Sequence, residues 1–183
     1  MSFFLALDLS DRVRAEVVRR IDHHRPNLPA KWLRPDKLHL TLRFLGHPTP
    51  AALATLEPGV RAVASVTAPL TLTLRGVGFF VTARAPSVLW LGVDGALLSL
   101  HALHASLRAA DDTRPFVPHV TLARAHTAGA LETLEPALRD FSSSPFTASH
   151  LTLYESTEAQ YRAVSRFDFA LSTVTACAGA HHR

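Results

Sequence analysis

The chain has 183 residues, 48% of them hydrophobic and 19% charged, and its 19 Lys+Arg and 15 Asp+Glu give a formal net charge of +4. This composition is typical of a globular chain with a sizeable core, and it excludes a disordered, collagen-like or coiled-coil protein. The single cysteine, Cys177, excludes an intrachain disulfide and a multi-cysteine zinc site, so we expect a reducing compartment.

The N-terminus and the longest apolar stretch give no sign of export or of a membrane anchor. No basic residues precede the apolar residues at the N-terminus, which meet Asp8 after a few positions. The apolar stretch 87–103 is interrupted by Asp94 and His101, so it is not expected to span a membrane. We therefore expect a cytoplasmic protein that acts as a monomer with no obligatory protein partner.

Apolar spacing predicts alternating strands and helices in the first half of the chain. The predicted strands are residues 3–8, 31–33 and 38–44. Ser10 is a suitable cap for a helix that runs to about residue 24, with apolar residues four apart along one face. A second helix starts at Pro50, and Pro58 is expected to kink or split it because proline lacks the helical N–H.

The second half of the chain continues this alternation. The predicted strands are residues 70–75, 87–93, 119–124, 146–155 and 161–171, and the predicted helices are residues 95–109 and 130–141. The order lacks a strict β-α-β rhythm, which predicts an α+β fold with largely antiparallel sheets. The eight glycines are scattered and form no dinucleotide-binding or phosphate-loop pattern.

One short pattern occurs twice, at positions 39 and 119. The segments His39-Leu40-Thr41-Leu42 and His119-Val120-Thr121-Leu122 both consist of histidine, an apolar residue, threonine and an apolar residue. Each lies in a predicted strand and follows a turn that contains a proline. Since residues two apart on a strand point to the same face, each histidine shares a face with its own threonine.

Two such strands facing each other would bring together two imidazoles and two hydroxyls. One ring can take a proton from an attacking water while the other gives a proton to a leaving oxygen, because the pKa of imidazole lies near neutrality. The hydroxyls can hold the non-bridging oxygens of a phosphate. This chemistry requires no metal and no cofactor. A lone His-x-Thr is a commonplace strand sequence, and the second copy is what favours a functional site.

The segments that carry the two copies resemble the motif regions of the two-histidine phosphoesterase superfamily. The closer resemblance is to its RNA 2′,3′-cyclic phosphodiesterase branch, also called 2′-5′ RNA ligase. Residues 31–46 are similar to the first motif region and residues 116–124 to the second. Residues 76–80 and 88–93 are similar to the middle strands of the family, and residues 153–156 with the later Tyr161 are similar to its closing hairpin. The resemblance extends from Met1 to about Leu171.

The resemblance implies one bilobal α+β phosphoesterase domain over residues 1–183, with antiparallel sheets of two pseudo-symmetric lobes facing a central cleft and helices outside. It also implies metal-independent hydrolysis of a terminal 2′,3′-cyclic phosphate on single-stranded RNA, leaving a 2′-phosphate. His39 would be the proton donor and His119 the proton acceptor, with Thr41 and Thr121 binding the phosphate. The motif itself does not fix which histidine has which role.

Five further residues are candidates for contacts with RNA or its phosphate: Arg43, Arg124, Trp32, Phe80 and Tyr161. Arg43 has the strand parity of His39, and the alternative is an arginine that faces solvent. Arg124 has the parity opposite to that of His119, so it reaches the cleft only if the strand ends or bulges at Ala123. The aromatic residues could stack on terminal bases, and core packing is the alternative for each of them.

Three classes of function remain open at this point. The first is a hydrolase of RNA ends, whose site could also run backwards and join 2′,5′ ends. The second is a non-catalytic module that binds RNA ends. The third is a metallohydrolase, for which His101 and His104 are one helical turn apart but have no carboxylate between them.

Overall fold

The structure is a computed structural model that describes residues 1–22, 24, 30–81, 87–125, 131–157 and 160–171. Cys177, from which a reducing compartment was inferred, lies outside these residues. Among the described residues, no helix has the length and apolar character needed to cross a membrane.

The strands are β1 (Ser2–Asp8), β2 (Lys31–Trp32), β3 (His39–Gly46), β4 (Leu70–Phe80), β5 (Ser87–Gly95), β6 (His119–Ala125), β7 (Phe146–Ala148), β8 (His150–Ser156) and β9 (Tyr161–Asp168). The helices are α1 (Asp11–Ile21), α2 (Pro50–Val66), α3 (Leu97–Leu107), α5 (Glu135–Leu138) and the short 3₁₀ helix η2 (Pro35–Lys37). The mixture of helices and strands confirms the predicted α+β class.

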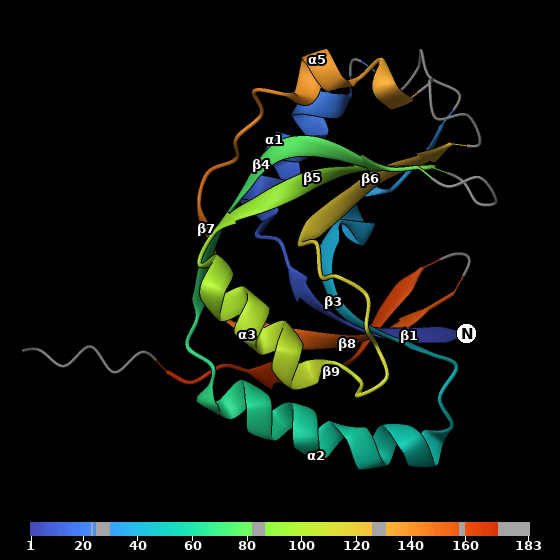
Figure 1. Cartoon of the computed structure of the whole chain (residues 1–183), viewed down its shortest axis with the longest axis vertical. Coiled ribbons are helices and arrows are strands. Elements are labelled where there is room, and N and C mark those ends of the chain that lie inside the picture. Colours follow the sequence, from blue (N-terminus) through green and yellow to red (C-terminus); the bar gives the residue numbers. More distant parts are fainter. Residues whose placement is uncertain (23, 25–29, 82–86, 126–130, 158–159, 172–183) are drawn as a thin grey trace, which may run out of the picture.

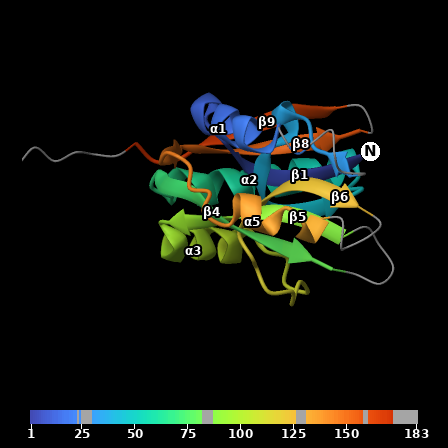
Figure 2. The same ribbon diagram turned by 90° about the horizontal axis from the view of Figure 1, so that it is seen from above.

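The strands form one curled sheet in the order β7-β4-β5-β6-β3-β1-β8-β9, and β2 pairs with β6. Every pairing is antiparallel. Two groups of strands diverge from the centre: β4, β5 and β6 on one side, and β3, β1, β8 and β9 on the other (Figures 1 and 2). They join where β3 pairs with β6, so the centre of the sheet is also the junction of the two groups.

Helices lie outside the sheet, with α1 and α5 at one end of the molecule and α2 and α3 at the other (Figure 1). Ser10 caps α1 by accepting a hydrogen bond from the Val13 amide at 3.3 Å. The predicted apolar face of α1 is buried through Val13, Val17 and Ile21. The helix ends at Ile21, three residues earlier than predicted.

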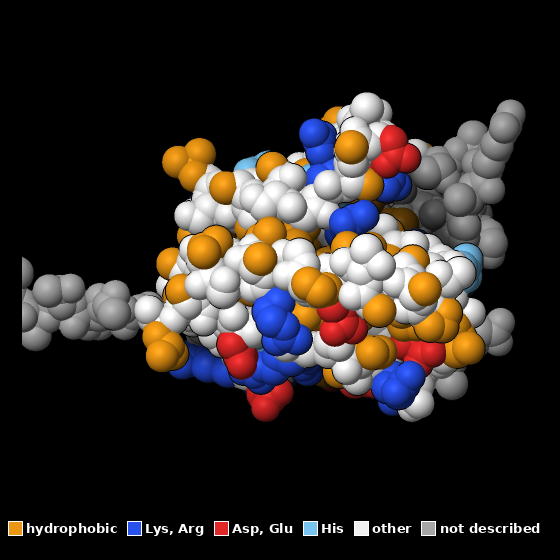
Figure 3. Space-filling view, turned by 90° about the horizontal axis from the view of Figure 1, so that it is seen from below, with side chains coloured by type: hydrophobic (Ala, Val, Ile, Leu, Met, Phe, Trp, Pro, Cys, Tyr) orange, Lys and Arg blue, Asp and Glu red, His pale blue; other side chains and the backbone are white. Residues whose placement is uncertain are grey.

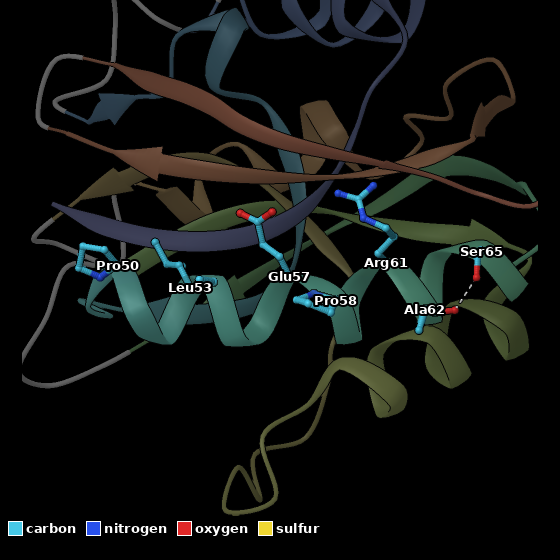
Figure 4. A pocket seen from close by; sticks show the side chains of 8 residues that line it. Pro50, Leu53, Glu57, Pro58, Arg61, Ala62 and Ser65 are labelled. Atoms are coloured by element: carbon cyan, nitrogen blue, oxygen red, sulfur yellow. Dashed lines mark hydrogen bonds between the residues drawn. The ribbon is translucent and has the colours of Figure 1, made fainter.

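The sequence predicted a kink or a split at Pro58, and α2 is not split there. It runs as one helix through this proline (Figure 4). Its inward side chains attach it to β9: the Ser165 hydroxyl donates to Glu57 at 3.0 Å, and the Arg61 guanidinium lies 5.2 Å from the Phe167 ring. These tertiary contacts compensate for the helical hydrogen bond that proline removes. The face of the molecule seen from the α2 end carries charged side chains of both signs among apolar ones (Figure 3), although α2 itself contributes only Glu57 and Arg61.

Two other predicted elements were too long. The helix predicted for residues 130–141 is interrupted by a turn at residues 133–134, and α5 is a single turn that begins beside Pro136. The strand predicted for residues 146–155 is split at Ser149 into β7 and β8, which pair with β4 and β1 respectively. The chain crosses from one group of strands to the other at this residue, which the apolar pattern did not indicate.

Gly78 provides a test of the packing behind the central strands. It lies opposite Trp90 in the β4–β5 pair, and a Cβ at Gly78 would lie 2.1 Å from the Trp90 ring. We expect Gly78→Ala to lower the free energy of unfolding by about 2 kcal/mol in urea titrations, because the indole must move.

Gly59 in α2 is the matched control, since a Cβ there meets no atom within 4 Å. Gly59→Ala is expected to raise the free energy of unfolding by about 0.5–1 kcal/mol, because alanine restricts the unfolded chain. A Gly78→Ala variant as stable as wild type would contradict this account of the packing.

Candidate active site

The two motif strands meet at the centre of the sheet as β3 and β6. Their antiparallel pairing places Leu40 opposite Val120. The next pairs in this register are His39 with Thr121 on one side and Thr41 with His119 on the other. The two copies of the motif therefore face each other across a local two-fold axis.

Strand alternation separates the reactive side chains from the core. His39, Thr41, His119 and Thr121 are half-buried. The residues between and after them are buried: Leu40, Leu42, Val120 and Leu122. The apolar face anchors both strands, and the opposite face presents the histidines and threonines.

Both imidazoles are held by a backbone carbonyl two residues earlier. Nδ1 of His39 lies 2.7 Å from the Lys37 carbonyl oxygen, and Nδ1 of His119 lies 2.7 Å from that of Val117. A carbonyl accepts hydrogen bonds, so Nδ1 carries the hydrogen in each ring and Nε2 is the nitrogen that exchanges protons. Nε2 of His39 lies 2.9 Å from the Thr41 hydroxyl, which donates to it when the ring is neutral.

Aromatic side chains enclose each imidazole. Phe4 stacks on His39 with ring centroids 4.7 Å apart, and Tyr161 meets the same ring edge-on at 5.4 Å. On the other side, Phe80 meets His119 edge-on at 4.9 Å, and Trp90 is tilted against it at 5.9 Å. These contacts limit the movement of both rings and withdraw them from water.

Burial makes the neutral form of both rings the stable one. It is the largest cause that lowers the pKa of His39, to about 4, and it also lowers the pKa of His119. Nearby charges act in opposite directions: Asp8 raises the pKa of His39, whereas Arg124 lowers that of His119. His119 also lowers the pKa of His39, so the two rings are close enough to interact.

A cavity of about 370 Å³ lies beside residues that contact His39, although neither histidine is part of its lining. Its lining contains the exposed cations Lys31, Arg34 and Arg124, together with Lys37 and the aromatic rings of Trp32 and Tyr161. Tyr161 connects the cavity to the site, because its ring contacts His39 and lies 4.6 Å below the Lys37 amine. The cavity thus offers positive charge and aromatic surface beside the histidines. A larger hollow of about 880 Å³ lies along α2 and is lined by residues of that helix.

Arg124 reaches this cavity through a β-bulge. Trp90 pairs with Thr121 whereas Leu89 pairs with Ala123, so Leu122 has no partner of its own on β5. The extra residue reverses the alternation of β6, and Leu122 and Ala123 are both buried. This bulge meets the condition that the sequence set for Arg124.

The other secondary candidates occupy different places. Trp32 and Tyr161 line the cavity with Arg124, whereas Phe80 packs between Trp90 and His119. Arg43 donates to the Leu107 carbonyl at 2.8 Å and so holds the end of α3, which gives it a structural partner.

Sequence reasoning missed three residues behind His39: Phe4, Asp8 and Tyr154. Phe4 and Asp8 have the same parity on β1, and Tyr154 stacks on Phe4 at 5.3 Å. The available signal was an acidic residue at the end of an otherwise apolar strand. This signal could be interpreted only from the structure, which pairs Asp8 with His39.

Comparison with known proteins identifies the family of this chain. A family model described as the 2′-5′ RNA ligase superfamily matches residues 9–160. The chain therefore belongs to the 2′-5′ RNA ligase superfamily.

Individual proteins of known name are also similar to this chain in sequence and in structure. A protein of Geobacillus stearothermophilus named RNA 2′,3′-cyclic phosphodiesterase is 33% identical over 161 residues, which cover 83% of this chain and 51% of that protein. The chain thus spans about half the length of this relative. A protein of Escherichia coli (strain K12) with the same name is 31% identical over 87% of this chain and 89% of its own length. The crystal structure of E. coli LigT complexed with 3′-AMP has a TM-score of 0.75 at 26% identity and covers 93% of this chain and 98% of that one.

The lowered pKa of His39 can be measured directly by NMR of the ring nitrogens. We expect His39 in the free protein to remain the neutral Nδ1–H form from pH 8 down to about pH 5 and to titrate near pH 4. A His39 midpoint at 6 or above would contradict the burial of this ring.

The same burial makes stability depend on pH. The His39 pKa is lower in the folded state than its ordinary value of 6.5, so the unfolded state binds more protons between pH 6.5 and 4. The stabilising contribution is complete above pH 6.5 and is lost as pH falls. We expect the free energy of unfolding to decrease by about 3 kcal/mol from this residue over that range. In His39→Gln this part of the decrease should be absent from urea titrations repeated at each pH.

Proposed function

We propose that the protein is an RNA 2′,3′-cyclic 3′-phosphodiesterase, which hydrolyses the terminal cyclic phosphate of single-stranded RNA to a 2′-phosphate. The observation that carries the proposal is the pairing of β3 with β6, which places two His-x-Thr segments face to face with both Nδ1 atoms bound to backbone carbonyls. The names of the relatives support the same substrate class.

The proposed reaction needs one proton donor and one proton acceptor. Nε2 of His119 takes a proton from a water, whose oxygen attacks phosphorus. The bond from phosphorus to the 3′ oxygen breaks, and this oxygen takes a proton from Nε2 of His39. The products are a 2′-phosphate and a free 3′ hydroxyl, and exchange with solvent returns the rings to their starting protonation.

The two threonines are assigned to the phosphate. Thr41 and Thr121 lie on the same face as the histidines, and their hydroxyls can donate to the non-bridging oxygens. The hydroxyl of Thr41 bonds His39 in the free protein, so it must turn toward the phosphate when substrate binds. Both groups of strands contribute to the site, one through β3 and the other through β6. The proposed reaction requires no cofactor and no protein partner.

The adjoining cavity is assigned to the rest of the RNA end. Arg124 and Lys31 supply positive charge for the backbone phosphates, and Trp32 and Tyr161 supply faces on which bases can stack. These contacts use features common to all nucleotides, so we expect little sequence preference. The same site can also join 2′,5′ ends when the 5′ hydroxyl of a second RNA takes the place of water and attacks phosphorus, although hydrolysis is favoured in water.

The test is hydrolysis of a short single-stranded RNA that ends in a 2′,3′-cyclic phosphate, with a chelator present, from pH 5 to 9. We expect wild type to produce the 2′-phosphate, and His39→Ala and His119→Ala each to lose about 10²–10⁴-fold in rate. Thr41→Ala and Thr121→Ala are expected to lose about 10–100-fold, because each removes one donor to the phosphate. His101→Ala on α3 is the control and should retain full activity.

The outcomes separate the three classes of function. Binding of the RNA without turnover by wild type would identify a non-catalytic module that recognises RNA ends. Activity that disappears with chelator would indicate a metallohydrolase. A 3′-phosphate product would mean that the other ester bond is cleaved and would overturn the proposed geometry.

A further inference from the structure

The two histidines face different residues on their neighbouring strands. In the β1–β3 pair Asp8 lies opposite His39, and in the β5–β6 pair Gly92 lies opposite His119. The local two-fold axis that relates β3 to β6 also relates these two positions. One histidine therefore faces a carboxylate and the other faces a residue without a side chain.

Packing maintains this asymmetry. A Cβ at Gly92 would lie 2.7 Å from the Arg75 carbonyl oxygen, so a larger residue cannot be placed there without moving backbone. On the other side of the axis, β1 places Asp8 opposite His39. The two halves of the site therefore differ at Asp8 and Gly92, the residues that lie opposite the two histidines.

Strand β8 holds the Asp8 carboxylate with three side chains. The Tyr154 hydroxyl donates to it at 2.6 Å, the Thr152 hydroxyl donates at 2.7 Å, and Nε2 of His150 lies at 3.1 Å. Three partners on alternate positions of one strand fix the position of the carboxylate. Burial, with the Asp8 contact, raises the pKa of Tyr154, which therefore remains a donor throughout the working range of pH.

Building on the proposed function, we propose that Asp8 is a positioning residue whose charge places the catalytic proton on His39, so that His39 protonates the leaving 3′ oxygen and His119 acts as the base. Asp8 does not contact the reacting atoms in this proposal. It acts through His39, from the strand directly beside it.

The other charged and titratable groups around the two rings are consistent with this assignment. His39 is faced by Lys37 of η2, Arg14 of α1, His119 of β6, Tyr154 of β8 and Tyr161 of β9. Arg14 is directed to the backbone by hydrogen bonds to the carbonyls of Leu9, Pro35 and Leu38, and it lowers the pKa of His39 less than Asp8 raises it. The charge that acts on the pKa of His119 is Arg124, which opposes protonation.

Substrate binding converts this bias into a protonation state. In the free protein burial outweighs Asp8, and His39 is neutral at pH 7. A bound cyclic phosphate adds a negative charge beside both rings and favours a proton on one of them. Asp8 adds to this effect at His39, whereas Arg124 subtracts from it at His119, so the proton is placed on His39.

The experiment compares two substrates that differ in the leaving atom. One is the RNA with a normal 2′,3′-cyclic phosphate, and the other carries sulfur in place of the 3′ oxygen. A thiol has a pKa of about 8.5, so a thiolate leaves without a proton donor, whereas an alkoxide needs one. The rate on the sulfur substrate therefore no longer depends on the acid but still depends on the base.

Asp8→Asn should lose about 10-fold in kcat on the oxygen substrate, with the alkaline limb of its pH profile about one unit lower. On the sulfur substrate it should be within about twofold of wild type, and His39→Ala should recover most of its activity too. His119→Ala should remain impaired on both substrates. Tyr154→Phe is the matched control, because it removes one hydrogen bond to Asp8 and keeps the charge, and its pH profile should not move.

Each failure has a distinct signature. If sulfur rescues His119→Ala instead of His39→Ala, the roles are reversed and the inference is overturned while the proposed hydrolysis stands. If Asp8→Asn and Tyr154→Phe lose activity equally on both substrates, Asp8 has a structural role and the inference is overturned. Absence of wild-type turnover on the oxygen substrate would instead refute the proposed function.

Discussion

The pairing of Leu40 with Val120 is the constraint on which the site depends. It is the register that joins the two groups of strands, and it brings together two motifs that are far apart in the sequence. A shift by one residue would turn the histidines to the opposite face of the sheet. The buried leucines and valine that alternate with the reactive residues prevent such a shift, so the same residues form the core and fix the geometry of the site.

The surroundings of the histidines have two opposed effects: they fix the positions of the rings, and they disfavour the protonated form that a proton donor needs. Aromatic contacts and carbonyl hydrogen bonds fix both rings, yet the burial that fixes them also removes their charge. Proton transfer between water, phosphate and leaving oxygen needs one charged ring. Under the proposed function, a phosphate anion would supply the missing stabilisation, so the site would become competent for proton donation when the substrate is bound.

The sequence was most informative where a pattern has a local cause. Strand alternation predicted which face His39 and His119 share with their threonines, and the spacing of apolar residues predicted the buried face of α1. It was least informative where distant contacts decide the outcome. The continuity of α2 through Pro58 depends on β9, and the split at Ser149 depends on two different partner strands. The bulge that turns Arg124 to the cavity depends on β5, and Asp8 gained a role only through its register with β3.

A repeated motif suggests two equivalent halves, but general acid–base catalysis requires that the halves differ. Two identical histidines in identical surroundings would share one proton equally, and half of the bound complexes would have it on the wrong ring. The difference therefore has to come from outside the motif, and the neighbouring strands are the nearest place for it. Asp8 on β1 and Gly92 on β5 supply this difference at equivalent positions. In a site built from two copies of one motif, the residues that differ between the surroundings of the two copies are the ones that assign the roles of acid and base.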